Sequence, residues 1–329
     1  MGISFAPDGA RARLIDFRMR QQLADSLEYL NQSFIQQMGT EIGGLADMVV
    51  SMRQGIIYPP STFGLYYEIT SALIDEDYDQ AMSFFDELLN EKPCSPEQVG
   101  IITLGQVPKV SNLLRYQRLM DTDPTMPFHI ESVPDVIAPQ SIAHFQSALN
   151  RLRQCIPELA KEFEALVRTV ILVKGESKAD YQFAGGSSYM LWGALFINAE
   201  LHTTDIATIE AMAHESAHSL LFGFSIDETL VLNTDEELYS SPLRYDPRPM
   251  DGIYHATFVS ARMHWAMSVL LKSGLLLAGE IEFASDARER DYTNFFSGYD
   301  TVMQHARMTE TGQRLMQSAY NYMQQQTKS

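Results

Sequence analysis

Basic residues, cysteines and long apolar runs are all scarce in this sequence. Lysine and arginine together number 24, against 42 aspartate and glutamate residues, and the net charge is −18. A surface of that sign repels both the phosphates of nucleic acid and the headgroups of an anionic membrane. The composition therefore argues against nucleic-acid binding and against membrane docking, and we expect neither kind of partner.

The two cysteines, Cys94 and Cys155, are far apart and lack the spacing of a metal site. Isolated cysteines in a chain of 329 residues are typical of a reducing compartment rather than of a disulfide scaffold. The amino-terminal stretch MGISFAPDGARARLIDF has no apolar signal-peptide core. The longest apolar run, VLLKSGLLLAG from Val269, is interrupted by Lys272 and is too short to span a bilayer. These absences predict a cytoplasmic protein.

The spacing of apolar residues predicts an α+β fold that is mostly helical. Residues 1–120 have the pattern of a helical region, and the prolines within residues 121–140 indicate a linker or a boundary. Residues 141–329 form the expected catalytic domain. Within it, two β-branched runs at 169–175 and 189–200, separated by a loop of small residues, predict two strands. We expect this small sheet to pack on the helix that follows it.

That following helix contains the motif HESAH, in the stretch IEAMAHESAHSLLFG. With Thr204 or Asp205 as its N-cap and Gly223 as its C-cap, the helix would have about 17 residues. Residues four apart lie one turn apart on the same helix face. His214 and His218 can therefore bind one metal ion at about 2.1 Å. The alternative is a buried pair of core histidines with no ligand.

A metal site needs at least one further ligand from elsewhere in the chain. A third histidine six residues after the second is absent, because that position is Phe224. His255, near the start of the next predicted helix, is the preferred candidate, and a carboxylate such as Glu236 or Glu237 is left open in its place. His264 lies about 180° around the helix from His255, so it is expected to be surface or core filler.

Three segments together suggest a family. These are HESAH, the upstream GGSSY, and SPLRYDPRPMDGIYHATFV, in which a histidine follows an arginine by seven residues. With them the sequence resembles the HExxH-motif proteins found beside ribosomally synthesised, post-translationally modified peptides. Members of that family are described as iron(II)- and 2-oxoglutarate-dependent peptide β-hydroxylases. The resemblance covers roughly the last 200 residues, and the first part of the chain matches only in being helical.

The resemblance implies an oxidoreductase of natural product biosynthesis, a dioxygenase that hydroxylates a carbon, in this family Cβ, of one residue in a precursor peptide. It implies Fe(II) as the metal, with His214, His218 and His255 as its protein ligands. Iron accepts imidazole and carboxylate alike, so ligand type does not decide between His255 and a carboxylate. On this reading Glu215 is not a general base, and it orients a histidine or a water molecule.

The cosubstrate 2-oxoglutarate is a diacid, and its second carboxylate requires a cation in a mostly buried site. Arginine is preferred because its planar guanidinium binds a carboxylate through two hydrogen bonds. The candidates near His255 are Arg248, Arg244 and Arg262. Each could equally form an ordinary salt bridge.

Two other functions remain compatible with the sequence. In a zinc peptidase, Zn²⁺ would occupy the same histidines and Glu215 would accept a proton from the bound water. In a non-catalytic interaction protein, the helices would present the precursor peptide to other enzymes. The arginines beside His255 favour the oxygenase, since a peptidase has no obligatory anion receptor close to its metal. The sequence is also compatible with a homo-oligomer.

Overall fold

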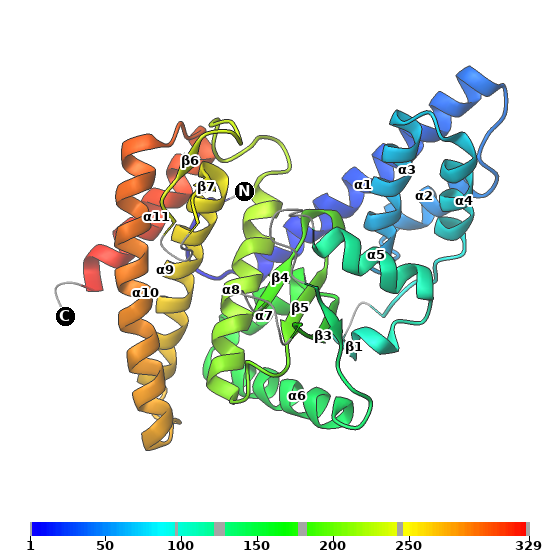
Figure 1. The fold of residues 1–329 in the computed structure, drawn as a ribbon. Coiled ribbons are helices and arrows are strands. Elements are labelled where there is room, and N and C mark those ends of the chain that lie inside the picture. The colour runs from blue at the N-terminus through cyan, green and yellow to red at the C-terminus, as the bar shows by residue number, and fades with distance from the viewer. Residues whose placement is uncertain (1, 96–97, 122–128, 177–182, 242–245, 327–329) are drawn as a thin grey trace. The chain divides into compact units, whose positions relative to one another are not determined.

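The computed structural model describes residues 2–95, 98–121, 129–176, 183–241 and 246–326 (Figure 1). Within these ranges the chain forms eleven α-helices and a small number of short strands. The predicted α+β, mostly helical fold class is confirmed. The chain divides into two compact units: unit 1 consists of Met1–Ala12, Ala143–Ala165 and His202–Ser329, and unit 2 consists of Arg13–Ile142 and Leu166–Leu201.

Unit 2 contains the first helices of the chain. They are most of α1 (Gly9–Met38), then α2 (Leu45–Arg53), α3 (Ser61–Ile74), α4 (Tyr78–Leu89) and α5 (Val110–Met120). At α4 the sequence determines both ends. The Asp77 side chain caps its first turn by accepting a hydrogen bond from the Gln80 amide, and the helix ends shortly before Pro93.

The main sheet of the described chain also lies in unit 2. Its strands are β1 (Gly100–Thr103), β2 (Glu131–Ser132), β3 (Thr169–Lys174), β4 (Gly185–Ser187) and β5 (Ala194–Asn198). The order is β1-β3-β5-β4, with β2 beside β3; β1, β3 and β5 are parallel, and the other two are antiparallel to their neighbours. The inner residues of β3 and all of β5 are buried, as a strand covered on both faces requires. Leu104, Tyr116 and Phe196 belong to the core that covers it.

The second predicted strand and the loop before it need correction. Residues 189–191 form a 3-10 turn, so the strand begins only at Ala194. Gly193 causes this delay, because its φ of 88° interrupts an extended backbone. The small residues predicted as a loop include strand β4, whose glycines pair with β5. Met120 and Phe183 lie where a side chain on Gly186 would project, which explains a glycine inside this strand.

Unit 1 contains the helices that carry the motif. They are most of α6 (Ala138–Cys155), then α7 (Pro157–Leu166), α8 (Asp205–Phe224), α9 (Met250–Lys272), α10 (Ala278–His305) and α11 (Glu310–Gln326). Helix α6 ends at Cys155, and Pro157 occupies the first position of α7. Helix α9 packs against α8, α10 and α11, and it is preceded by a short ribbon of β6 (Leu238–Tyr239) and β7 (Arg248–Pro249) (Figure 1).

Helix α8 is longer than its sequence predicts. Thr204 is the N-cap, and its hydroxyl accepts a hydrogen bond from the Ala207 amide at 3.2 Å. The predicted C-cap at Gly223 is wrong. The helix continues to Phe224 for a total of 20 residues, and the Ser225 amide closes it on the carbonyls of Leu221 and Phe222.

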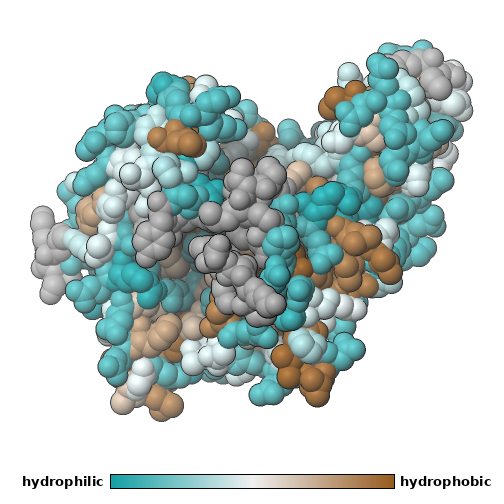
Figure 2. Space-filling model, viewed as in Figure 1, coloured by the Kyte–Doolittle hydropathy of each residue, from teal (hydrophilic) through white to brown (hydrophobic). Residues whose placement is uncertain are grey.

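No helix in the described ranges is both long and apolar enough to cross a membrane. Hydrophilic residues cover most of the described surface on the face in Figure 2, and hydrophobic residues gather there in several separate groups.

Candidate metal centre

Three imidazoles meet between helices α8 and α9. The Nε2 atoms of His214 and His218 lie 3.1 Å apart, and the Nδ1 atoms of His218 and His255 lie 2.9 Å apart. His214 and His218 follow one another by one turn of α8, and His255 comes from the second turn of α9. The structure thus brings together the three histidines that the sequence singles out, although 37 residues separate the last two.

Two side chains that sequence reasoning missed complete the surroundings. Met263 places its sulfur 3.4 Å from Nδ1 of His214. The ring of Phe222 lies 5.3 Å from that of His255, centroid to centroid. Helical spacing could have identified both residues from the sequence, because Phe222 lies one turn after His218 and Met263 lies two turns after His255. His255 is 6% exposed and the His214 side chain 26%, so the cluster opens to solvent on the His214 side.

All three imidazoles are held in their neutral form. Burial lowers the pKa of His214 to about 4, with a contribution from His202. Burial also lowers the pKa of His218 well below its usual value, and the two neighbouring histidines add to the effect. The pKa of His255 is lowered by burial, although Asp251 opposes the shift. Near neutral pH each ring therefore keeps a lone pair for a metal ion or for a hydrogen bond.

The donor set suits a transition-metal ion, and the spacing suits it in part. Two nitrogens bound at right angles to one ion, each at about 2.1 Å, lie about 3.0 Å apart. The measured separations are close to this value. His218, however, directs one ring nitrogen at His214 and the other at His255. As the rings now lie, the described residues contain no group of three His, Cys, Asp or Glu side chains placed to hold a metal. For one ion to meet a nitrogen of all three imidazoles, at least one ring would have to change its orientation.

Glu215 is buried beside this cluster. Its side chain is on the same helix turn as His214, and its Oε1 atom lies 3.8 Å from Nε2 of His214. That nitrogen is also the one that faces His218. A separation of 3.8 Å is too long for a hydrogen bond to the ring, but a carboxylate at this position can reach a water molecule bound beside that nitrogen.

The carboxylates left open as substitutes for His255 are placed differently. Glu237 accepts hydrogen bonds from Arg307, Tyr239 and Asn233, which lower its pKa to about 2. Glu236 is exposed and bonds to Thr234. Neither contact involves a histidine of the cluster, whereas His255 touches His218 directly.

The three arginine candidates have different surroundings. Arg262 is 1% exposed; its guanidinium donates to the Phe5 carbonyl at 2.7 Å and pairs with the buried carboxylate of Glu162. Arg248 is half-buried in β7, directly before α9, with its Nε atom 2.7 Å from a carboxylate oxygen of Asp246. Arg244 lies outside the described residues.

His264 is separate from the cluster. It is buried on α9, and its Nδ1 atom lies 2.9 Å from the Tyr322 hydroxyl, on α11. The helical spacing that excluded it as a ligand partner of His255 is consistent with this position.

Neither the models of known protein families nor the curated protein sequences give a match to this chain. The functional argument therefore rests on the chemistry of these residues.

Proposed function

We propose that this protein is an iron(II)- and 2-oxoglutarate-dependent oxygenase that hydroxylates a carbon, Cβ in our proposal, of a residue in a ribosomal precursor peptide. The observation that carries the proposal is the meeting of three neutral imidazoles, from α8 and α9, with an arginine directly before α9. When bound, iron and cosubstrate would supply the oxidising power, since 2-oxoglutarate, dioxygen and the peptide together yield succinate, carbon dioxide and the hydroxylated peptide, with one oxygen atom entering each of succinate and peptide.

The residues of the chain would bind, orient and exclude water. His214, His218 and His255 are the proposed ligands of the metal. Glu215 would orient a water molecule beside the metal, because its carboxylate lies on the same side of the His214 ring as Nε2, the nitrogen that faces His218. Phe222 would keep water from the His255 side of the centre, because its ring packs against that imidazole.

Arg248 is the arginine that we propose for the second carboxylate of the cosubstrate. Arg262 already pairs with Glu162 in a fully buried site, whereas Asp246, which pairs with Arg248, is partly exposed. An incoming diacid can replace such an aspartate at small cost, because a solvent-accessible ion pair contributes little free energy.

A zinc peptidase is the second candidate, and the position of Glu215 favours it. The carboxylate lies within 3.8 Å of a ligand nitrogen, close enough to reach a water molecule on the same ion. The two candidates thus use the same histidines and differ in what Glu215 and the arginines do.

Anaerobic reconstitution tests the proposal. Metal-free protein is mixed with Fe(II) and then with 2-oxoglutarate, and the visible spectrum is recorded. We expect a weak metal-to-ligand charge-transfer band that requires both additions, and slow succinate formation once oxygen is admitted. The control is Zn²⁺-loaded protein with an unstructured peptide mixture. Peptide cleavage without any iron-dependent succinate would establish the peptidase, and absence of bound metal would favour the interaction protein.

Replacement of Glu215 separates the two enzymes. In Glu215→Gln we expect iron-dependent succinate formation to stay within about 10-fold of the wild type, because an amide can still hold a water molecule by hydrogen bonds. A peptidase would lose about 100- to 10,000-fold, the usual contribution of a general base. Glu210→Gln, five residues earlier on α8, is the matched control. If succinate formation in Glu215→Gln falls as far as in a ligand variant, the orienting role is wrong.

A further inference from the structure

Two cations of unit 1 lack an acidic partner among the described residues, although the chain has 42 aspartate and glutamate residues. Arg288 of α10 and Lys272 at the end of α9 make no ion pair or hydrogen bond to any residue of the described ranges, yet both lie close enough to His264 to act on its charge. Elsewhere cations are commonly paired, as Arg151 is with Glu280. With a net charge of −18, two unpaired cations beside one buried imidazole suggest that an anion is expected there.

Figure 1 shows helices α9, α10 and α11 in this part of the fold. A pocket here is lined by residues of all three helices. Its volume is about 330 Å³, which is within the range of roughly 300–1,000 Å³ typical of small-molecule sites. The lining residues are His264, Arg288, Glu289, Tyr292 and Gln326. His264 forms the inner wall, since it is 3% exposed, and Arg288 is exposed at the opening.

The inner wall offers a hydrogen-bond donor beside aromatic rings. Burial raises the pKa of Tyr322 to about 12 and lowers that of His264 to about 4, so both side chains are uncharged near pH 7. Binding of an anion here uses the tautomer in which the Tyr322 phenol donates to Nδ1 of His264, so that the imidazole proton is on Nε2. That nitrogen has no hydrogen-bond partner among the described residues. The ring of Tyr292 stands 6.0 Å from His264, centroid to centroid, and provides a flat apolar surface.

We infer that this pocket binds a small organic carboxylate with a flat body. Its acid group would be held by the Arg288 guanidinium and the His264 Nε2–H, and its body would lie against Tyr292. A guanidinium beside a neutral N–H donor matches the acceptor geometry of a carboxylate. The lining has one cation, Arg288, and one acid, Glu289. A cationic ligand, which aromatic rings also attract, is disfavoured because the charges of Arg288 and Lys272 that act on His264 are both positive.

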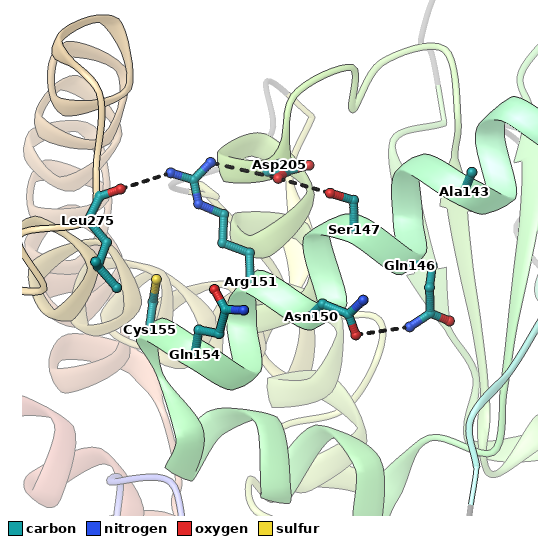
Figure 3. Close-up of a pocket in the computed structure, with 9 residues that line it drawn as sticks. All are labelled: Ala143, Gln146, Ser147, Asn150, Arg151, Gln154, Cys155, Asp205 and Leu275. Atoms are coloured by element: carbon teal, nitrogen blue, oxygen red, sulfur yellow. Dashed lines mark hydrogen bonds and ion pairs between the residues drawn. The ribbon is translucent and has the colours of Figure 1, made fainter.

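Another pocket of unit 1 shows the contrast. It has a volume of about 640 Å³ and lies along α6, where Arg151 points toward Asp205 and the Leu275 carbonyl (Figure 3). The same guanidinium makes two hydrogen bonds of 2.6 Å to Glu280. Its charge is already neutralised by the chain, so that pocket shows no comparable demand for an anion.

The test measures the binding of 4-fluorobenzoate, as the probe, to the metal-free chain. Fluorine NMR monitors the titration. We expect saturable binding to the wild type and about a 10-fold or greater rise in Kd for Arg288→Gln, the loss expected for a charged hydrogen bond. Arg288 is exposed, so this variant should fold. Arg13→Gln, which removes an equally exposed arginine of unit 2, is the control and should bind like the wild type. The uncharged probe 4-fluorobenzamide should bind at least about 10-fold more weakly than the acid.

Three results would overturn the inference. They are no saturable binding of the acid, equal binding of acid and amide, or equal binding by the wild type and Arg288→Gln. Inorganic phosphate as a competitor distinguishes the kind of anion, because strong competition would make the site one for phosphate and not for carboxylate. The site is independent of the proposed iron centre, so His218→Ala should bind the probe with unchanged Kd.

Discussion

Replacing His218 with alanine is expected to reduce Fe(II) affinity by about 100-fold or more, since even loss of a supporting group around a metal costs about 10- to 100-fold. His218 stands between the other two imidazoles and contacts both, at 3.1 and 2.9 Å. Its removal takes away the imidazole that contacts both His214 and His255. We therefore expect iron-dependent succinate formation to be lost together with the metal. Equilibrium dialysis under anaerobic conditions measures the first effect, and succinate analysis measures the second.

A structural role of the cluster would give a different outcome. Without any metal, the same distances describe a chain of hydrogen bonds from ring to ring, whose loss would destabilise the fold but remove no ligand. Thermal unfolding separates the two. A metal bound only by the folded state stabilises it by about 2.7 kcal/mol at a concentration 100 times the Kd.

We expect Fe(II) to raise the Tm of the wild type and of His305→Ala, which lacks an exposed histidine of α10, but not that of His218→Ala. Equal Tm shifts in His218→Ala and the wild type would falsify the metal centre.

The candidate centre could be predicted from the sequence only where local spacing determines it. Positions i and i+4 of a helix share a face whatever the rest of the fold does, so His214 and His218 could be paired in advance. His255 depends on how α9 packs on α8, which no local pattern specifies. Its prediction as the third ligand rests on the family resemblance and on its place near the start of a helix. Spacing does not specify the orientation of each imidazole ring either. The contact of His218 with both His214 and His255 therefore could not be predicted from the sequence.

Short elements and distant partners limited the rest of the prediction. Strand β1 lies in the region predicted to be helical. It has only four residues, which is too few for an alternating apolar pattern to indicate a strand. Strand β4 consists of Gly185, Gly186 and Ser187, which local propensity assigns to a turn. Only its pairing with β5 makes it a strand. For Arg262, the sequence showed a free cation near His255, while its partner Glu162 lies 100 residues away.

That pairing predicts a large loss of stability when Glu162 is replaced. The carboxylate is 0% exposed; it accepts hydrogen bonds from the Asp8 amide at 3.0 Å and from Arg11 at 3.2 Å, and it also pairs with Arg262. Glu162→Ala leaves two buried guanidinium groups without their counter-ion. Breaking a buried pair in this way costs about 3–5 kcal/mol. Urea denaturation, which adds no salt, measures the change, and an unfolding free energy within about 1 kcal/mol of the wild type would contradict it.

Two further variants test whether the buried ion cluster causes this loss of stability and whether Arg262 binds the cosubstrate. Glu158→Ala removes an exposed acid from the same helix, where its pair with Lys161 should contribute less than about 1 kcal/mol. Replacing the whole cluster, with Glu162→Leu, Arg11→Met and Arg262→Met together, should recover most of the loss, because apolar side chains often substitute well for a buried ion group. If Arg262 serves only as a counter-ion, this stable variant keeps its apparent KM for 2-oxoglutarate. A rise of about 10-fold or more would instead make Arg262 the receptor for the cosubstrate and remove Arg248 from that role.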